Sequence, residues 1–389
     1  MIFWKGIGMN KTKITALLLI LSCIAAGCKD QPEETTTSET QAPLAPSTVA
    51  TTTTVATSGT TTESTEDTTS VPTPGDVTEP MILSAFNSAK LLVGDIFDAN
   101  EYISYIDDHD RRPVLSVETP VDTTKPGVYE TALLVTDANG NQARKSLTVR
   151  VVTGEETPTP TPEGVTPTPT PVPEPKNLDF YEFKSRYDGD IEFGIDVSKW
   201  QGDVDYGMIK QEGCSFVIIK AGTYYKGEFV FDAKYEQNLA NAKAAGLKVG
   251  LYYYTPVTSE EVVRDCVDKI CESLNGMELE LPIAYDMEQW KRFQQYGINL
   301  QDLNGLFYAF CEECGKYGYE GMLYNSKNKL ETVWDAKDHP VWLAHYTRET
   351  SYEGEYMLWQ VSNVGRIPGI SGDVDLNILY NKKGNDLEA

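Results

Sequence analysis

The stretch from residue 215 to residue 255 contains one β-α-β unit, and it decides the fold. "SFVIIKAG" (215–222) and "LKVGLYYYT" (247–255) are nearly continuous apolar runs of strand length. Between them, "DAKYEQNLANAKAAG" (232–246) spaces its apolar residues as a helix does and ends at a glycine. Strands that are apolar on both faces are typical of a parallel sheet covered by helices. The stretch therefore predicts two parallel strands joined by a helix.

Six more apolar runs of strand length surround this unit. They are "IEFGIDVS" (191–198), "LPIAYDME" (281–288), "EGMLYNS" (320–326), "PVWLAHY" (340–346), "YMLWQVS" (356–362) and "DVDLNILY" (373–380). The connections between the last of these runs leave little room for helices. Eight strands in about 190 residues predict an α/β fold, a barrel of the triosephosphate-isomerase type whose last helices are lost or shortened.

The N-terminal part of the chain is predicted to export and tether this barrel. Residues 1–28 resemble a lipoprotein signal peptide, because basic residues precede the apolar run "ITALLLILSCIAAG" and then Cys28, the predicted lipidation site; simple secretion is the alternative. Residues 29–79 form a Thr/Ser-rich tether whose composition predicts disorder. Residues 154–177 form a Pro-Thr linker that is expected to be extended. The catalytic domain is then expected at 178–389.

Residues 80–153 predict a small all-β domain between the two spacers. The run "GVYETALLVTDANGNQARKSLTVRVV" (127–152) reads as a hairpin, with Asn139-Gly140 as a primed turn. The stretch 122–141 resembles bacterial immunoglobulin-like repeats of surface proteins, which implies a sandwich that serves as a spacer, with ligand binding as the alternative. Because this part has no cysteine, the sandwich would lack an intersheet disulfide.

Charge and cysteine content exclude several function classes. The formal net charge is 33 − 58 = −25, and no basic cluster follows the first dozen residues, which argues against a nucleic-acid partner. Five cysteines remain outside the signal, an odd number, so a complete disulfide framework is excluded. Cys266, Cys271 and the "CEEC" of 311–314 allow a four-thiolate zinc site, but buried thiols or one bridge between helices are favoured. With three histidines and no ligand spacing, we expect neither a metal nor a cofactor.

Two carboxylates at the end of one predicted strand point to the chemistry. Asp286 and Glu288 in "IAYDMEQW" (283–290) lie one residue apart, so their side chains face the same way with α-carbons about 6.5 to 7 Å apart. Two like charges at that range in a pocket disfavour double ionisation, so one pKa rises and supplies an acid at neutral pH. Paired carboxylates of this kind are what the hydrolysis of a glycosidic bond requires. A strand-capping role is the alternative.

Other polar and aromatic residues stand at or near the carboxyl ends of the predicted strands, where barrel enzymes have their active sites. Asp196 and Asp375 are the further candidate catalytic residues. Lys220 is expected either to hold one of the acids or to bind sugar, and the aromatic residues either to pack in the core or to stack on sugar rings. The candidate substrate-binding residues are Lys220, Tyr252, Tyr254, Tyr324, Trp342, Tyr346 and Gln360.

Seven motifs together resemble glycoside hydrolase family 25, the Chalaropsis-type lysozymes. They are "FGIDVSKWQGDVDY" (193–206), "FVIIKAG" (216–222), "NAKAAGLKVGLYYY" (241–254), "IAYDME" (283–288), "VWLAHY" (341–346), "LWQVS" (358–362) and "GISGDVDLN" (369–377). The resemblance covers about residues 190–381 and implies a barrel of five β/α units and three further strands. It also implies cleavage of the β-1,4 bond between N-acetylmuramic acid and N-acetylglucosamine in peptidoglycan.

The resemblance assigns roles to the four acids. It implies that Glu288 is the general acid and base, and that Asp286 stabilises the oxocarbenium-like centre or orients the substrate's N-acetyl group. Asp196 and Asp375 would position water, substrate or the catalytic pair. Two departures from the family pattern, Tyr206 in place of a common tryptophan and the absence of a frequent histidine in "YYY", bear on subsite preference.

Two alternatives and a cellular setting complete the hypothesis. A chitinase or endo-N-acetylglucosaminidase of the related barrel type would need a D-x-x-D-x-D-x-E run, of which only "AYDME" is present. An inactive wall-binding protein is the other alternative, although all four acids are present. The expected setting is a monomeric protein on the outer face of the bacterial membrane or in the cell wall, held by its lipid anchor or secreted, with peptidoglycan strands as partner.

Overall fold

The computed structural model describes residues 71–154 and 177–381. The predicted signal peptide with Cys28, the tether up to residue 70 and the linker residues 155–176 lie outside the described residues. Within the described ranges, every helix is too short or too polar to span a lipid bilayer.

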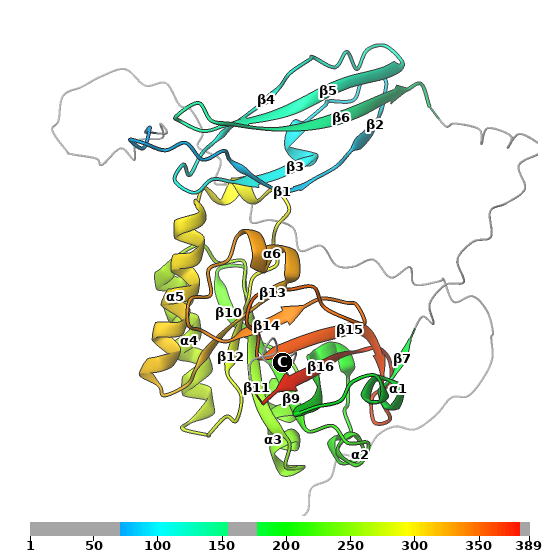
Figure 1. Cartoon of the computed structure of the whole chain (residues 1–389), viewed down its shortest axis with the longest axis vertical. Helices are drawn as coiled ribbons and strands as arrows, with labels where there is room; N and C mark the ends of the chain where they lie inside the picture. Colours follow the sequence, from blue (N-terminus) through cyan, green and yellow to red (C-terminus); the bar gives the residue numbers. More distant parts are fainter. Residues whose placement is uncertain (1–70, 155–176, 382–389) are drawn as a thin grey trace, which may run out of the picture. The chain divides into compact units, whose positions relative to one another are not determined.

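The first described part is built from strands in two sheets (Figure 1). In one sheet, β1 (Met81–Ala85) pairs antiparallel with β3 (Ile103–Ile106). The other has the order β2-β6-β5-β4, formed by β2 (Ser88–Leu92), β4 (Val114–Val117), β5 (Gly127–Thr136) and β6 (Gln142–Val152). A short 3-10 helix, η1 (Ala99–Glu101), precedes β3. Alternating residues of both sheets, among them Ile103, Leu133 and Leu147, form a common apolar core. We call residues 81–152 the β domain.

The hairpin of β5 and β6 is confirmed, but its turn differs from the predicted one. The strands pair up to Thr136 and Gln142, so five residues connect them. The Gly140 N–H donates to the Asp137 carbonyl (3.3 Å), and Gly140 has φ +92°, whereas Asn139 keeps a negative φ. A primed two-residue turn needs positive φ at both central residues. The loop is wider because the Asp137 carboxylate accepts from the backbone N–H groups of Asn139 (2.9 Å) and Asn141 (2.8 Å).

The second described part is a ten-stranded, barrel-like sheet. The strand order is β10-β9-β11-β12-β13-β14-β15-β16-β8, and β8 also pairs with β9, which closes the ring. The small strand β7 pairs with β15 outside this path. The strands are β7 (Leu178–Asp179), β8 (Ile191–Val197), β9 (Phe216–Tyr225), β10 (Glu228–Phe231), β11 (Lys248–Tyr254), β12 (Ile283–Asp286), β13 (Gly321–Ser326), β14 (Val341–Ala344), β15 (Leu358–Arg366) and β16 (Val374–Tyr380).

Helices lie on the outside of this sheet (Figure 1). They are α1 (Phe180–Ser185), α2 (Tyr206–Gln211), α3 (Tyr235–Ala244), α4 (Glu260–Leu274), α5 (Leu300–Lys316) and α6 (Lys327–Thr332), with the 3-10 turns η2 (Lys199–Gln201) and η3 (Phe293–Tyr296). The longest, α5, begins at a capping box in which the side chains of Asn299 and Asp302 each accept from the other's backbone N–H. Between β14 and β16 there is no helix, as the short connections predicted.

Side chains alternate between two apolar layers. One layer fills the inside of the ring and includes Phe216, Met322 and Trp342. The other lies between the sheet and its helices. Gly194 is required on the inside, because a Cβ there would lie 2.5 Å from the carbonyl oxygen of Phe216. All five cysteines of this part are buried and unpaired, and burial raises the pKa of Cys214 to about 12.

Two features differ from the expected parallel sheet. Strand β16 runs antiparallel to both of its neighbours, β15 and β8. Strand β9 continues past the barrel and turns at Lys226-Gly227 into β10, which pairs with its second half. Both features follow from short connections: seven residues join β15 to β16 and two join β9 to β10, fewer than the roughly dozen that a crossover between parallel neighbours needs.

Candidate active site

The two predicted carboxylates lie where β12 ends. Asp286 is the last residue of the strand and only 5% exposed, whereas solvent reaches Glu288 two residues later. Burial, and after it the charge of Glu288, raises the pKa of Asp286 well above its usual range. Surrounding atoms also desolvate Glu288 and raise its pKa, with Asp196 as the next cause. Between them, the Met287 carbonyl accepts from the Asn325 side chain (2.8 Å), which holds this strand end to β13.

Asp196 faces this pair from β8 and is held by two amides. Its Oδ2 accepts from Gln360 Nε2 (2.9 Å) on β15 and from Asn377 Nδ2 (2.8 Å) on β16. The Asn377 oxygen in turn accepts from Trp342 Nε1 (2.8 Å), which fixes how that amide is oriented. Burial raises the pKa of Asp196 to about 6, while the two amide hydrogen bonds lower it.

Tyrosine hydroxyls extend this network toward the opening. Gln360 Oε1 accepts from Tyr324 (2.8 Å) and from Tyr346 (2.9 Å). Tyr324 is buried against the Trp342 ring, with 4.5 Å between ring centroids, whereas Tyr346 is 51% exposed. The network therefore runs from the buried floor to a solvent-facing aromatic side chain.

Lys220 and Asp375 complete the set of charged residues. The Lys220 ammonium lies over the rings of Tyr254 (4.7 Å to the centroid) and Tyr252 (5.9 Å). Desolvation lowers the pKa of Lys220, and the charge of Asp286 is the largest opposing influence. Asp375 is the register partner of Asp196, and burial followed by the charges of Asp196 and Glu288 raises its pKa to about 9. All eleven candidate catalytic and substrate-binding residues thus lie on the strands of one ring or directly after them.

A family comparison accounts for this arrangement. Residues 195–370 match the model of glycosyl hydrolases family 25. In this region the chain belongs to that family. The match contains Asp196, Asp286 and Glu288, and Asp375 lies five residues beyond it.

Curated family 25 relatives include two proteins named as lysozymes. "Autolytic lysozyme" of Clostridium acetobutylicum is 28% identical over 190 residues, which is 47% of this chain and 54% of that protein. "Lysozyme M1" of Streptomyces globisporus is 30% identical over 201 residues, 47% of this chain and 66% of that protein. The chain thus spans between half and two thirds of their length. A solved family 25 glycosyl hydrolase from Bacillus anthracis aligns with 51% of this chain and 91% of its own at 22% identity, with a TM-score of 0.41.

On the ring of strands and directly after them, three polar residues of the site were not singled out from the sequence. Asn377 is fully buried and donates to Asp196, Asn325 holds the strand end that carries the acids, and Gln289 donates to the Tyr254 hydroxyl. Asn377 had a recognisable signal. It lies two residues after Asp375 and shares its face of the strand, where an amide among apolar residues needs a partner.

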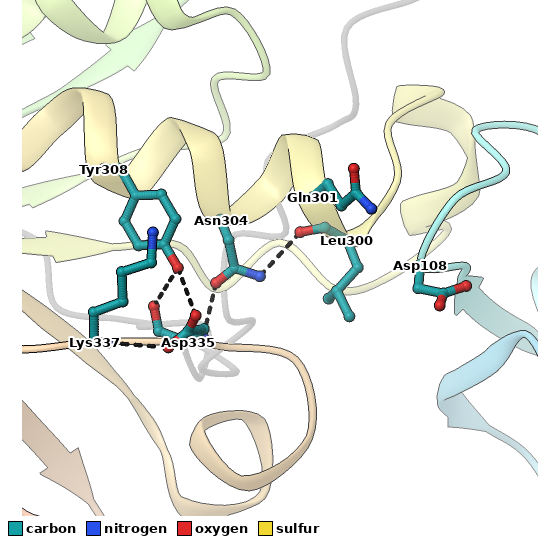
Figure 2. Close-up of a pocket in the computed structure, with 7 residues that line it drawn as sticks. All are labelled: Asp108, Leu300, Gln301, Asn304, Tyr308, Asp335 and Lys337. Atoms are coloured by element: carbon teal, nitrogen blue, oxygen red, sulfur yellow. Dashed lines mark hydrogen bonds between the residues drawn. The ribbon is translucent and has the colours of Figure 1, made fainter. Parts of the chain in front are cut away.

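Two other features of the described chain lie away from the family 25 acids. A hollow of about 330 Å³ runs along the first turns of α5 (Figure 2) and contains no candidate acid. It is lined by Asp108, Leu300, Gln301, Asn304, Tyr308, Asp335 and Lys337. In the β domain and just before it, Asp76, Asp108 and His109 bring potential ligand atoms within 4.8 Å of one another, and His109 Nδ1 pairs with Asp108 (3.0 Å). Neither feature belongs to the ring of strands that carries the acids.

Proposed function

We propose that this chain is a peptidoglycan hydrolase that cleaves the β-1,4 bond between N-acetylmuramic acid and N-acetylglucosamine. The observation that carries the proposal is the carboxylate pair Asp286 and Glu288 at a strand end of a family 25 barrel, with both pKa values raised. Two acids of this kind are the minimum that glycosidic hydrolysis needs. The names of the curated relatives support the same reaction.

In the proposed mechanism Glu288 delivers the proton. The pair favours holding a proton, because burial and the charge of Glu288 raise the pKa of Asp286, and desolvation raises the pKa of Glu288. Of the two, Glu288 is the residue that solvent, and therefore a glycan, reaches. Glu288 would protonate the leaving oxygen and then deprotonate the attacking water. Asp286 would stabilise positive charge at the anomeric carbon or orient the substrate's N-acetyl group.

The remaining residues bind and position the glycan. Asp196 and Asp375 would orient water, substrate or the pair from the opposite wall. Tyr346 offers an exposed ring, and Lys220, Tyr252 and Tyr254 form a cationic and aromatic patch suited to hydroxyl and N-acetyl groups. Tyr324, Trp342 and Gln360 would shape the floor, since all three are buried.

The proposed architecture has the working domain standing off a membrane. The element order supports a (β/α)5(β)3 variant of the TIM barrel at 178–389, and the two sheets support an immunoglobulin-like domain at 80–153. Lipidation at Cys28, the tether and the Pro-Thr linker would place a monomeric enzyme at the outer face of the bacterial membrane or in the wall, where its substrate lies.

The test is product analysis with the full chain. Purified protein should release reducing ends from peptidoglycan, and mass spectrometry should find N-acetylmuramic acid at the new ends. N-acetylglucosamine ends would instead identify an endo-N-acetylglucosaminidase. Binding to peptidoglycan without turnover on several wall types would identify an inactive wall-binding protein.

A further inference from the structure

The loop that follows Glu288 is held by the β domain. Residues 289–299, which we call the catalytic loop, connect β12 to α5. The Ser104 hydroxyl, on β3, donates to the Trp290 carbonyl and accepts from the Phe293 N–H (2.8 Å). Ser104 is 2% exposed, so these hydrogen bonds form away from water. The Trp290 N–H donates to the Glu288 carbonyl (2.9 Å), which connects Ser104 to the proposed acid through one residue.

Ion pairs hold the same loop from η1. Arg292 donates to Glu101 (2.7 Å) and contacts Asp98 (3.4 Å). Gln294 donates to the Asn100 side chain (3.2 Å). Arg292 has φ +55°, a left-handed conformation that a side chain other than glycine rarely adopts unless its surroundings impose it.

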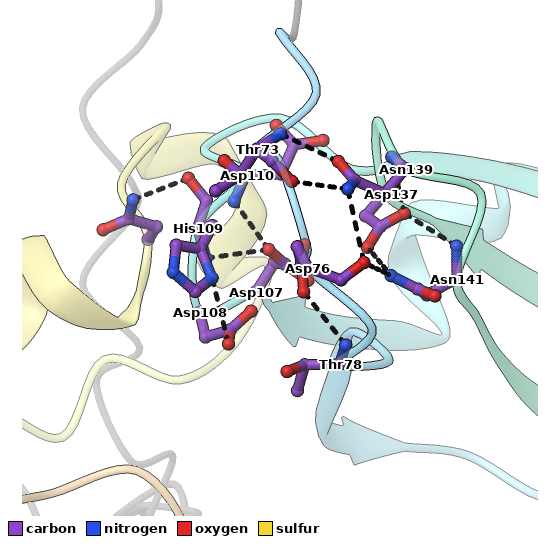
Figure 3. Close-up of polar contacts among 11 residues, drawn as sticks. Thr73, Asp76, Thr78, Asp107, Asp108, His109, Asp110, Asp137, Asn139 and Asn141 are labelled. Carbon is purple, nitrogen blue, oxygen red and sulfur yellow. Dashed lines mark hydrogen bonds and ion pairs between the residues drawn. The ribbon is translucent and has the colours of Figure 1, made fainter.

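The far end of the loop is held by the turn after β3 (Figure 3). The Asp107 carboxylate accepts from the N–H groups of His109 (2.9 Å) and Asp110 (2.6 Å), which folds this turn. The turn then offers two carbonyls to the start of α5. Asp107 O accepts from Leu300 N (2.8 Å), and His109 O accepts from the Asn299 side chain (2.8 Å).

Apolar and cation–π contacts also attach the catalytic loop and its surroundings to the β domain. Phe293 stacks on Trp290 with 5.3 Å between ring centroids, and the core that contains Phe293 also contains Leu83 and Ile106 of the β domain. Lys329, which is buried, donates to the Leu83 carbonyl (2.7 Å) and lies over the Trp290 ring. Burial of this kind is typical of permanent rather than transient contacts.

We propose that the β domain is a positioning part of the active site, with Ser104 as its central positioning residue. This inference rests on the proposed function of Glu288. Glu288 lies two residues beyond the last paired residue of β12, and Asn325 holds only the preceding Met287 to the sheet, so the place of Glu288 also depends on the loop that follows it. By fixing both ends of that loop, the β domain sets how far water surrounds the acid.

The first test is Ser104→Ala in the full chain. The variant leaves the Phe293 N–H and Trp290 carbonyl without their partner, so the loop loosens and Glu288 gains water. We expect kcat to fall roughly tenfold with a smaller change in KM, because the proposed glycan-binding residues lie outside the loop and only Tyr254 is held by it, through Gln289. We also expect the alkaline limb of the pH profile to move to lower pH, because a better solvated Glu288 has a lower pKa.

The matched control is Arg144→Ala, which removes an exposed ion pair with Glu118 (2.7 Å) in the same domain. It should match the wild type in kcat and pH profile. If Ser104→Ala matches this control in both, the inference fails, even where the melting temperature of Ser104→Ala falls.

A charge swap keeps the test decisive if Ser104→Ala does not fold. Glu101→Arg and Arg292→Glu should each lower kcat, and the double variant should recover part of the loss. A double variant no better than the poorer single variant would overturn the inference. Glu288→Gln separates the two hypotheses. If this variant is as active as the wild type, the proposed function fails too. If it is inactive while Ser104→Ala has wild-type kcat and pH profile, only the positioning role is contradicted.

Discussion

Two carboxylates on different walls of the barrel opening, Asp196 and Asp286, have opposite surroundings. On the β8 and β16 wall, Asp196 receives two amide N–H donors and its pKa is raised only to about 6. On the β12 wall, the buried Oδ1 of Asp286 has no hydrogen-bond partner in the described part of the chain, and its pKa is raised well above the usual range. Donors stabilise a charge and their absence favours a proton. Asp196 is therefore favoured as an anion, whereas the β12 wall favours a proton. Asp375, the register partner of Asp196, also favours a proton, because burial and neighbouring charges raise its pKa to about 9.

The strongest test of this contrast is Glu288→Gln on the proton-holding wall. Loss of a general acid costs roughly 10²- to 10⁴-fold in rate, so reducing-end release should fall by that factor. The matched control is Glu182→Gln, the same change on the exposed helix α1, where Glu182 pairs with Arg186. A drop of less than tenfold for Glu288→Gln, or an equal drop in the control, would contradict the assignment.

Asp286→Asn should separate activity from stability on the same wall. Activity should fall about 10²-fold or more, because an amide can neither share the pair's proton with Glu288 nor carry negative charge in the transition state. The folded pKa of Asp286 lies above the unfolded value, so the native state binds this proton more tightly and stability falls as pH rises above the unfolded value. The variant should therefore have a melting temperature a few degrees above that of the wild type at pH 7, but not at pH 4. Each kcal/mol of added stability corresponds to about 2–4 °C. A lower melting temperature at pH 7 would show that Asp286 is stabilised as an anion.

Asn377→Leu should weaken the support of the Asp196 anion. It removes one donor to Asp196 and leaves Trp342 Nε1 without its acceptor, which costs about 1–3 kcal/mol of stability. With one donor fewer, the pKa of Asp196 rises above about 6, and the acid limb of the activity profile should move to higher pH. Urea unfolding and a pH series measure the two effects, and an unmoved acid limb would show that Asp196 does not need to be ionised.

The smallest effect is expected from Tyr346→Phe, at the solvent end of the network. Gln360 keeps its hydrogen bond from Tyr324, and the exposed ring remains, so the loss should be at most about tenfold and should appear mainly in KM. Stability should be unchanged by thermal melting. A loss of activity as large as that of Asp286→Asn would show that the Tyr346 hydroxyl takes part in catalysis.

The alternation of side chains along a strand predicted most of the candidate site. The features that it did not predict depend on contacts between residues far apart in the sequence. Asp196, Lys220, Asp286 and Glu288 could be placed on the inside because a strand repeats every two residues. The antiparallel direction of β16 could not be predicted in this way, because the alternation of apolar and polar residues is the same for a parallel and an antiparallel strand. The contacts of Ser104 with Trp290 and Phe293 join residues nearly two hundred positions apart, and no local pattern encodes them.

The five buried thiols have a consequence for the conditions in which this chain folds. Oxidation and disulfide exchange require a thiolate that solvent can reach, whereas all five cysteines are buried and burial raises the pKa of Cys214 and Cys266. Its described part holds together without a single covalent cross-link, by packed side chains and hydrogen bonds alone. Reductants should therefore leave the stability of this part unchanged.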